Sequence, residues 1–74
     1  MLLTDLNPGD CARVLGYSEE SDYSQKLMRL GLIPGTQLEV KRFAPLGDPM
    51  EIRFRGFSLT LRPGEASCLR LEKL

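Results

Sequence analysis

The chain has 74 residues, enough for one domain, and a chain of this length buries only about 60% of the surface that it exposes when unfolded. Ten basic and ten acidic residues cancel at neutral pH, so the whole molecule lacks the electrostatic footprint of a general nucleic-acid binder. Histidine is absent, which removes the commonest general base and transition-metal ligand, and no apolar run approaches the roughly 18 residues that cross a bilayer. With no signal-type core at the start, we expect a cytoplasmic protein with a single domain over residues 1–74.

Three Pro-Gly pairs punctuate the chain, and each predicts a type II turn, because proline fixes one φ and glycine accepts a positive one. After the first pair, residues 11–16 are predicted to form a strand with Val14 pointing inward and Arg13 outward. The pairs are Pro8-Gly9, Pro34-Gly35 and Pro63-Gly64.

A short helix is predicted after the polar segment 18–21. Asp22 and Gln25 have the spacing of a capping box, and Gly31 supplies a left-handed stop. Apolar residues recur at helical spacing, and basic residues occupy the last turn, where the helix dipole favours them. The apolar positions are Tyr23, Leu27 and Leu30, and the basic ones are Lys26 and Arg29.

Four further strands are predicted from alternation of apolar and polar residues over 37–43, 50–55, 57–62 and 66–73. Gly56 permits a tight reversal between the third and fourth strands, and the fifth can pair with the first. The fold class is therefore mainly β: a small SH3-like barrel of about five strands, with one short α-helix between the first and second strands. The expected inward residues are Leu38, Val40, Met50, Ile52, Phe54, Phe57, Leu59, Leu61, Leu69 and Leu71.

Reactive chemistry is not expected. Cys11 and Cys68 could meet if the first and last strands pair, but we interpret them as reduced structural thiols, and Cys11 has no histidine to activate it. The acidic segment 19–22 favours the start of a helix over weak binding of a divalent ion. We therefore expect no enzymatic activity, no metal site and no cofactor.

Three regions are candidates for contact with a partner, each with a structural alternative. The helix-end turn is either a backbone stop with Leu30 and Ile33 buried, or a docking site with Met28 and Leu32 as an apolar knob. The loop 44–49 is either a connection stiffened by prolines, with Asp48 capping its own turn, or a partner-facing loop. The hairpin arginines Arg53, Arg55 and Arg62 either form a solvated face balanced by Glu51 and Glu72, or contact acidic groups on a protein, a lipid surface or a nucleic acid. The candidate residues are Met28, Leu30, Gly31, Leu32, Pro34, Gly35, Pro45, Gly47, Asp48, Arg53 and Arg55.

Several motifs, taken in order and spacing, resemble the FeoA family over nearly the whole chain. These small cytosolic proteins are associated with bacterial ferrous-iron uptake through the membrane transporter FeoB. A similar barrel also forms the C-terminal domain of iron- and manganese-responsive repressors. The motifs are Leu6-Asn7-Pro8-Gly9-Asp10, Leu27-Met28-Arg29-Leu30-Gly31-Leu32-Ile33-Pro34-Gly35, Ala44-Pro45-Leu46-Gly47-Asp48-Pro49 and Leu59-Thr60-Leu61-Arg62.

The resemblance implies a non-enzymatic accessory protein that docks on the cytosolic region of FeoB and supports its assembly or activity. It would be peripheral to the membrane through that partner, with no nucleic acid expected. A start methionine close to the first strand favours a free-standing protein over a repressor fragment. The alternative is an SH3-like module associated with nucleic acid or a repressor, and self-association through free edge strands stays open. A binder of proline-rich peptides is disfavoured, because the chain has no tryptophan.

Overall fold

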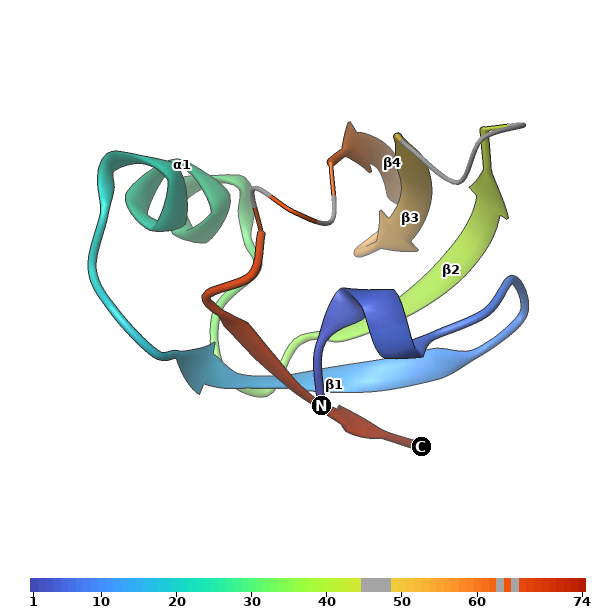
Figure 1. Ribbon diagram of the computed structural model, residues 1–74, viewed down its shortest axis with the longest axis horizontal. Coiled ribbons are helices and arrows are strands. Elements are labelled where there is room, and N and C mark those ends of the chain that lie inside the picture. Colours follow the sequence, from blue (N-terminus) through green and yellow to red (C-terminus); the bar gives the residue numbers. More distant parts are fainter. Residues whose placement is uncertain (45–48, 63, 65) are drawn as a thin grey trace.

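The computed structural model describes residues 1–44, 49–62, 64 and 66–74. Five antiparallel strands form one sheet in the order β4-β3-β2-β1-β5, and the helix lies between β1 and β2 in sequence (Figure 1). The predicted mainly β fold with one short helix is confirmed. The elements are a 3-10 turn η1 (Leu3–Asp5), β1 (Cys11–Tyr17), α1 (Asp22–Leu30), β2 (Gln37–Phe43), β3 (Met50–Phe54), β4 (Phe57–Leu61) and β5 (Leu69–Lys73).

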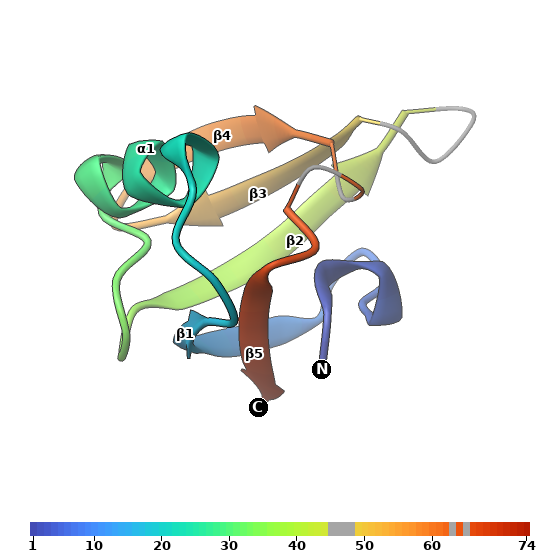
Figure 2. The same cartoon turned by 60° about the vertical axis from the view of Figure 1, so that its left-hand side comes forward.

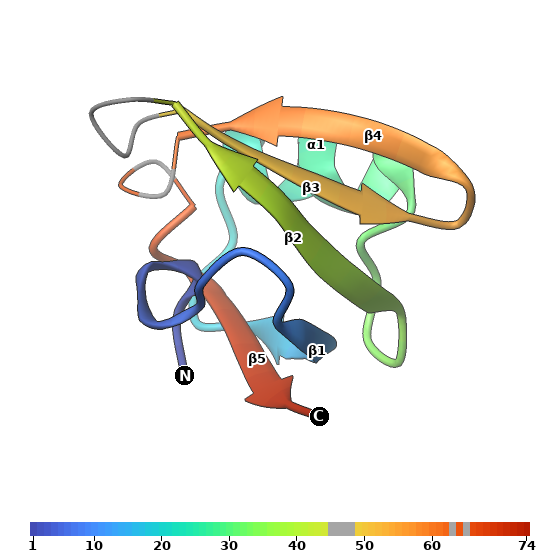
Figure 3. The ribbon, with the colours of Figure 1, turned by 90° about the vertical axis from the view of Figure 1, so that its right-hand side faces the viewer.

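The sheet is strongly curved, and it stays open. Register shifts between Val14 and Gly16 in β1 and between Val40 and Arg42 in β2 insert extra residues into the ladder, which bends and twists the strands. β5 pairs with β1 as predicted, yet β4 and β5 remain the two edges of the sheet. The helix α1 lies beside β3 and β4 (Figures 2 and 3).

One apolar core fills the inside of the curve. All five residues predicted to point inward from β2 and β3 are buried, as are Leu69 and Leu71. The 3-10 turn adds Leu3 and Leu6 to this core, a contribution that the alternation pattern did not reveal. Burying such side chains supplies most of the driving force available to so small a domain.

The predicted inward row of β4 is only partly correct. Leu61 is buried and Leu59 half-buried, but Phe57 is 54% exposed. The reason is position: Phe57 begins an edge strand directly after the hairpin turn, beyond the reach of the core. Its ring packs edge-on against that of Phe54, with centroids 5.4 Å apart and planes at 83°.

Two of the Pro-Gly turns have the predicted geometry. The Asp10 N–H donates to the Asn7 carbonyl at 2.9 Å, and the Thr36 N–H donates to the Ile33 carbonyl at 3.0 Å. The glycine of each turn has φ +93°, as the third residue of a type II turn requires. The third pair falls on Pro63, which lies outside the described residues.

The helix begins one residue away from the predicted cap. The Ser21 hydroxyl accepts from the Ser24 N–H at 3.1 Å, and the Ser24 hydroxyl oxygen accepts from the Ser21 N–H at 2.9 Å. The predicted Asp22/Gln25 capping box is therefore wrong, because a serine is as good a cap as an aspartate and Ser24 completes the reciprocal pair. The stop at Gly31, with φ +112°, is confirmed.

Both cysteines are free thiols, Cys11 exposed and Cys68 buried. They do not meet, although their strands are neighbours. In the antiparallel register Ala12 lies opposite Lys73 and Tyr17 opposite Leu69, so the two cysteines flank opposite ends of the paired segment.

Candidate functional site

The loop from Gly31 to Thr36 joins α1 to β2, and hydrogen bonds hold it from three sides. The N–H groups of Gly31 and Leu32 donate back to the Leu27 carbonyl at the helix end. The Thr36 hydroxyl donates to the Gly31 carbonyl at 2.9 Å, and the Tyr17 hydroxyl donates to the Leu32 carbonyl at 2.7 Å. The loop is therefore a fixed platform between two candidate surfaces.

The first surface is the helix-end corner, which we define as Leu30, Ile33, Arg55 and Phe57. The helix end and the β3-β4 turn lie at the same end of the molecule (Figures 2 and 3). A Cβ added to Gly31 would lie 3.5 Å from both the Phe54 ring and the Arg55 side chain, so these segments are in close contact. Leu30 and Ile33 are 40% and 39% exposed. The corner thus offers apolar side chains beside a positive charge.

Arg55 carries the unusual backbone of this corner. Its φ is +51°, the one positive φ found at a non-glycine residue in the described part of the chain, and Gly56 follows with +86°. Two successive positive φ values form a type I′ hairpin turn, which favours asparagine, aspartate or glycine at the position of Arg55. Left-handed backbone costs an ordinary residue about 1 to 2 kcal/mol. The arginine is therefore not the residue that stability alone would select.

The hairpin arginines Arg53, Arg55 and Arg62 are exposed, as predicted. Their predicted acidic partners are engaged elsewhere. Glu51 pairs with Arg42 of the neighbouring strand at 2.8 Å. Glu72 lies 3.7 Å from the side chain of Arg13, which faces it from β1.

The structure separates the residues predicted for the helix-end turn. Leu32 is fully buried, so the prediction that it forms an exposed knob is wrong, and the prediction that Ile33 and Leu30 are buried is also wrong. Gly31 reverses the chain with a positive φ, which carries Leu32 into the core and turns Ile33 outward. Gly35 lies in the exposed Pro-Gly turn. Pro45, Gly47 and Asp48 lie outside the described residues.

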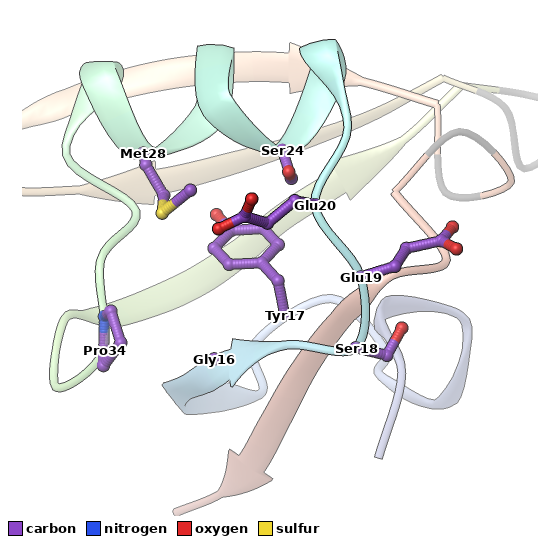
Figure 4. A pocket seen from close by; sticks show the side chains of 8 residues that line it. All are labelled: Gly16, Tyr17, Ser18, Glu19, Glu20, Ser24, Met28 and Pro34. Atoms are coloured by element: carbon purple, nitrogen blue, oxygen red, sulfur yellow. The ribbon is translucent and has the colours of Figure 1, made fainter.

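The second surface is a hollow of about 360 Å³ between α1, the end of β1 and the Gly31–Thr36 loop. In Figure 4 the side chains of Met28 and Ser24 extend from α1 toward Tyr17, while Glu20 reaches into the same space. Met28 and Pro34, both predicted as partner residues, therefore line this hollow and not the corner. The lining residues are Gly16, Tyr17, Ser18, Glu19, Glu20, Ser24, Met28 and Pro34.

Tyr17 lies at the centre of the hollow, and sequence reasoning gave it no role. Burial, followed by the negative charge of ionised Cys68 and Tyr23, raises the pKa of Tyr17 to about 12. The phenol is therefore neutral at physiological pH and acts as a hydrogen-bonding and stacking group. No sequence signal marks this residue, because its surroundings come from α1 and from β5.

The described residues contain no group of three or more cysteine, aspartate or glutamate side chains placed to hold a metal ion. Within the same residues, no helix has the length and apolar character required to span a bilayer.

The five antiparallel strands and single helix define a small SH3-like domain. A family model described as FeoA domain matches residues 1–73. The chain therefore belongs to the FeoA family, which is associated with ferrous iron transport and is not a known enzyme family.

Solved structures of FeoA proteins show the same fold. The FeoA protein of Chlorobium tepidum, solved by NMR, is 43% identical with a TM-score of 0.90, and the match covers 100% of this chain and 70% of that one. The FeoA of Stenotrophomonas maltophilia, described as an SH3 domain protein and solved in complex with zinc, has a TM-score of 0.84. It is 21% identical, over 97% of this chain and 89% of that one, and shows the fold alone.

A curated relative joins this domain to a transporter. The Fe(2+) transport protein A/Fe(2+) transporter FeoB fusion protein of Porphyromonas gingivalis is 26% identical over 72 residues. The match covers 97% of this chain but only 8% of the fusion protein.

Proposed function

We propose that this protein is a non-enzymatic, cytosolic accessory protein of bacterial ferrous iron uptake that docks on the cytosolic part of FeoB and supports its assembly or activity. The fusion in Porphyromonas gingivalis supports this proposal, because one polypeptide there contains both a FeoA domain and the transporter. Two domains that are covalently joined in one organism are held at high effective concentration, and separate chains must achieve the same proximity by binding.

The helix-end corner is the observation that carries the docking part of the proposal. Leu30, Ile33 and Phe57 are large apolar side chains left partly in water, and Arg55 adds a charge beside them. Removing such surface from water contributes about 25 cal/mol for each Å² buried, and aromatic and arginine side chains are frequent anchors of interfaces. The strained backbone at Arg55 supports selection for binding at this corner over stability.

Co-purification with the transporter tests the proposal. The tagged wild-type chain is expected to retain FeoB from detergent-solubilised membranes, and Phe57→Ser and Ile33→Ser are each expected to weaken that retention. Leu74→Ser is the matched control, because Leu74 is also exposed, at 51%, and the C-terminus lies away from the helix end and the β3-β4 turn (Figure 2). Equal retention of FeoB by all variants would contradict docking at the helix-end corner.

Ferrous iron uptake in cells gives a second readout. A strain that lacks this chain is expected to take up less ferrous iron under anaerobic, iron-poor conditions, and the wild-type gene is expected to restore uptake. Normal uptake in the deletion strain would contradict the accessory role itself. Labelled RNA that bound more tightly at low salt than at high salt would instead support a nucleic-acid module.

A further inference from the structure

Most of the hydrogen-bond donors that line the hollow beside Tyr17 already donate to acceptors within the protein. The Tyr17 hydroxyl donates to the Leu32 carbonyl at 2.7 Å, and the Ser24 hydroxyl donates to the Ser21 carbonyl at 3.0 Å. The Ser24 N–H is likewise occupied by the Ser21 hydroxyl. Ser18 on the rim is the remaining hydroxyl of the lining, and its own N–H donates to the Cys68 carbonyl at 2.8 Å.

The lining offers acceptors and negative charge in place of donors. Glu19 and Glu20 both line the hollow, and no basic residue is among its eight described lining residues. Figure 4 shows that Glu20 extends toward Tyr17 and Met28, whereas Glu19 extends away from them. Within the part of the chain that the structure describes, no hydrogen bond or ion pair occupies the Glu20 carboxylate. The site therefore favours a ligand that is rich in donors and positively charged.

The floor of the hollow suits a cation carried on an apolar stem. Tyr17 presents an aromatic ring, and a guanidinium or ammonium group over the face of such a ring is attracted by the negative charge of its π system. Met28 adds a flexible, polarizable side chain that adapts to the shape of a neighbour. The volume of about 360 Å³ lies at the lower end of ligand pockets, which suits one long side chain better than a large ligand.

We propose that this hollow takes a basic side chain, preferably an arginine, from the polypeptide that docks on the adjoining helix-end corner. The hollow and the corner flank the same Gly31–Thr36 loop, so one partner segment can cover both. A planar guanidinium can lie along the Tyr17 ring and donate to the Glu20 carboxylate, an arrangement that an ammonium group cannot reproduce. The inference rests on the proposed function in requiring a polypeptide partner, but its test needs no transporter.

NMR titration of the isotope-labelled chain with blocked peptides tests the hollow directly. The probes are acetylated and amidated Gly-Ala-Arg-Ala-Gly and the same peptides with lysine or citrulline in place of arginine; citrulline keeps the shape of arginine and removes its charge. We expect saturable shifts at Tyr17, Glu20 and Met28 with the arginine peptide, smaller ones with lysine and none with citrulline.

Glu19 provides a matched control for Glu20, because the two variants remove the same charge from neighbouring exposed positions. Glu20→Gln is expected to raise the Kd of the arginine peptide at least about fivefold, since a charge-assisted hydrogen bond is lost. Glu19→Gln is expected to raise this Kd less than about twofold, because Glu19 contributes only screened, longer-range attraction.

Four outcomes would overturn this inference. They are equal effects of the two variants, equal binding of the citrulline peptide, shifts spread over all acidic side chains, and saturation of the same resonances by Mg²⁺ at lower concentration than by the arginine peptide. Failure here is distinguishable from failure of the docking proposal. A hollow that binds arginine in a chain that does not retain FeoB would contradict only the proposed function, and the reverse pair of results would contradict only the assignment of the hollow.

Discussion

The Tyr17 hydroxyl donates a 2.7 Å hydrogen bond to the Leu32 carbonyl oxygen and so ties the end of β1 to the loop that follows α1. The bond joins residues 15 positions apart in sequence and links the hollow, which Tyr17 lines, to the Gly31–Thr36 loop that also borders the helix-end corner. Leu32 anchors the same loop from the other side by burying its side chain completely. The geometry of the loop is therefore fixed by two adjacent contacts, one polar and one apolar.

Removing the Tyr17 hydroxyl should weaken the fold modestly and remove one ionisation. Tyr17→Phe keeps the ring and leaves the Leu32 carbonyl without its partner, so we expect a loss of about 1 kcal/mol in the free energy of unfolding. Denaturant unfolding at neutral pH measures this loss. A Tyr17→Phe protein as stable as the wild type would show that water replaces the hydroxyl at no cost.

Alkaline pH should destabilise the wild type through the same residue. The folded pKa of Tyr17, about 12, lies above the ordinary tyrosine value of 10.0, so between these values the unfolded chain loses the proton that the folded chain retains. The stabilisation from the neutral phenol is therefore complete below pH 10 and is lost as pH rises through about 12. The difference in phenolate absorbance between the wild type and Tyr17→Phe should show a midpoint near pH 12. A midpoint near 10 would contradict the burial of this phenol.

The contrast between Leu32 and Ile33 supplies a second prediction. Leu32→Ala should lower the free energy of unfolding by about 2 to 5 kcal/mol, because it opens a cavity in the core. Ile33→Ala removes a partly exposed side chain, and we expect a change within about 0.5 kcal/mol. Thermal unfolding of the two variants measures the difference. Comparable losses in both would show that Ile33 belongs to the core.

Leu32 and Ile33 also show which features of the fold the sequence predicts and which it does not. Alternation along β2 and β3 predicted five core residues correctly, because a strand places alternate side chains on opposite faces. Helical spacing carries no such information past Gly31, where the positive φ changes the direction of the chain. For that reason the sequence patterns predicted an exposed Leu32 and a buried Ile33, whereas the structure shows the reverse.

The hollow could not be predicted from the sequence, for a different reason. Its lining comes from the end of β1, the segment that follows it, α1 and the Pro34 turn, and these segments meet only after the sheet has curved. The sequence predicts Met28 and Pro34 as partner residues, but nothing in their spacing points to Tyr17 or Glu20. Sequence patterns report faces of single elements, whereas this site is formed between elements.

The helix cap gives a third prediction. Ser21→Ala removes the acceptor for the Ser24 N–H, and we expect a loss of about 1 kcal/mol in the free energy of unfolding that persists in high salt. Asp22→Asn is the control, since it removes only a charge in the first turn, whose effect of about 0.3 to 1 kcal/mol is screened by salt. Chemical unfolding at low and high ionic strength separates the two. A larger loss for Asp22→Asn in high salt would restore aspartate as the cap.

Relieving the backbone strain at Arg55 should stabilise the protein and impair its binding. Asparagine adopts a φ of +51° more readily than arginine, and the strain relieved exceeds the favourable interaction of about 0.3 to 1 kcal/mol between Arg55 and the C-terminal end of α1. We therefore expect Arg55→Asn to raise the free energy of unfolding by about 0.5 kcal/mol and the melting temperature by a few degrees. Retention of FeoB should fall at the same time.

Arg53→Asn is the matched control for this last prediction, because it removes the same charge from the regular strand β3. Asparagine is a poor strand residue, so this variant should be slightly less stable than the wild type, and it should retain FeoB better than Arg55→Asn. A gain in stability without any loss of retention would mean that the strain at Arg55 has no connection with docking. A loss of stability in Arg55→Asn would mean that the contact between Arg55 and the helix end outweighs the cost of its backbone.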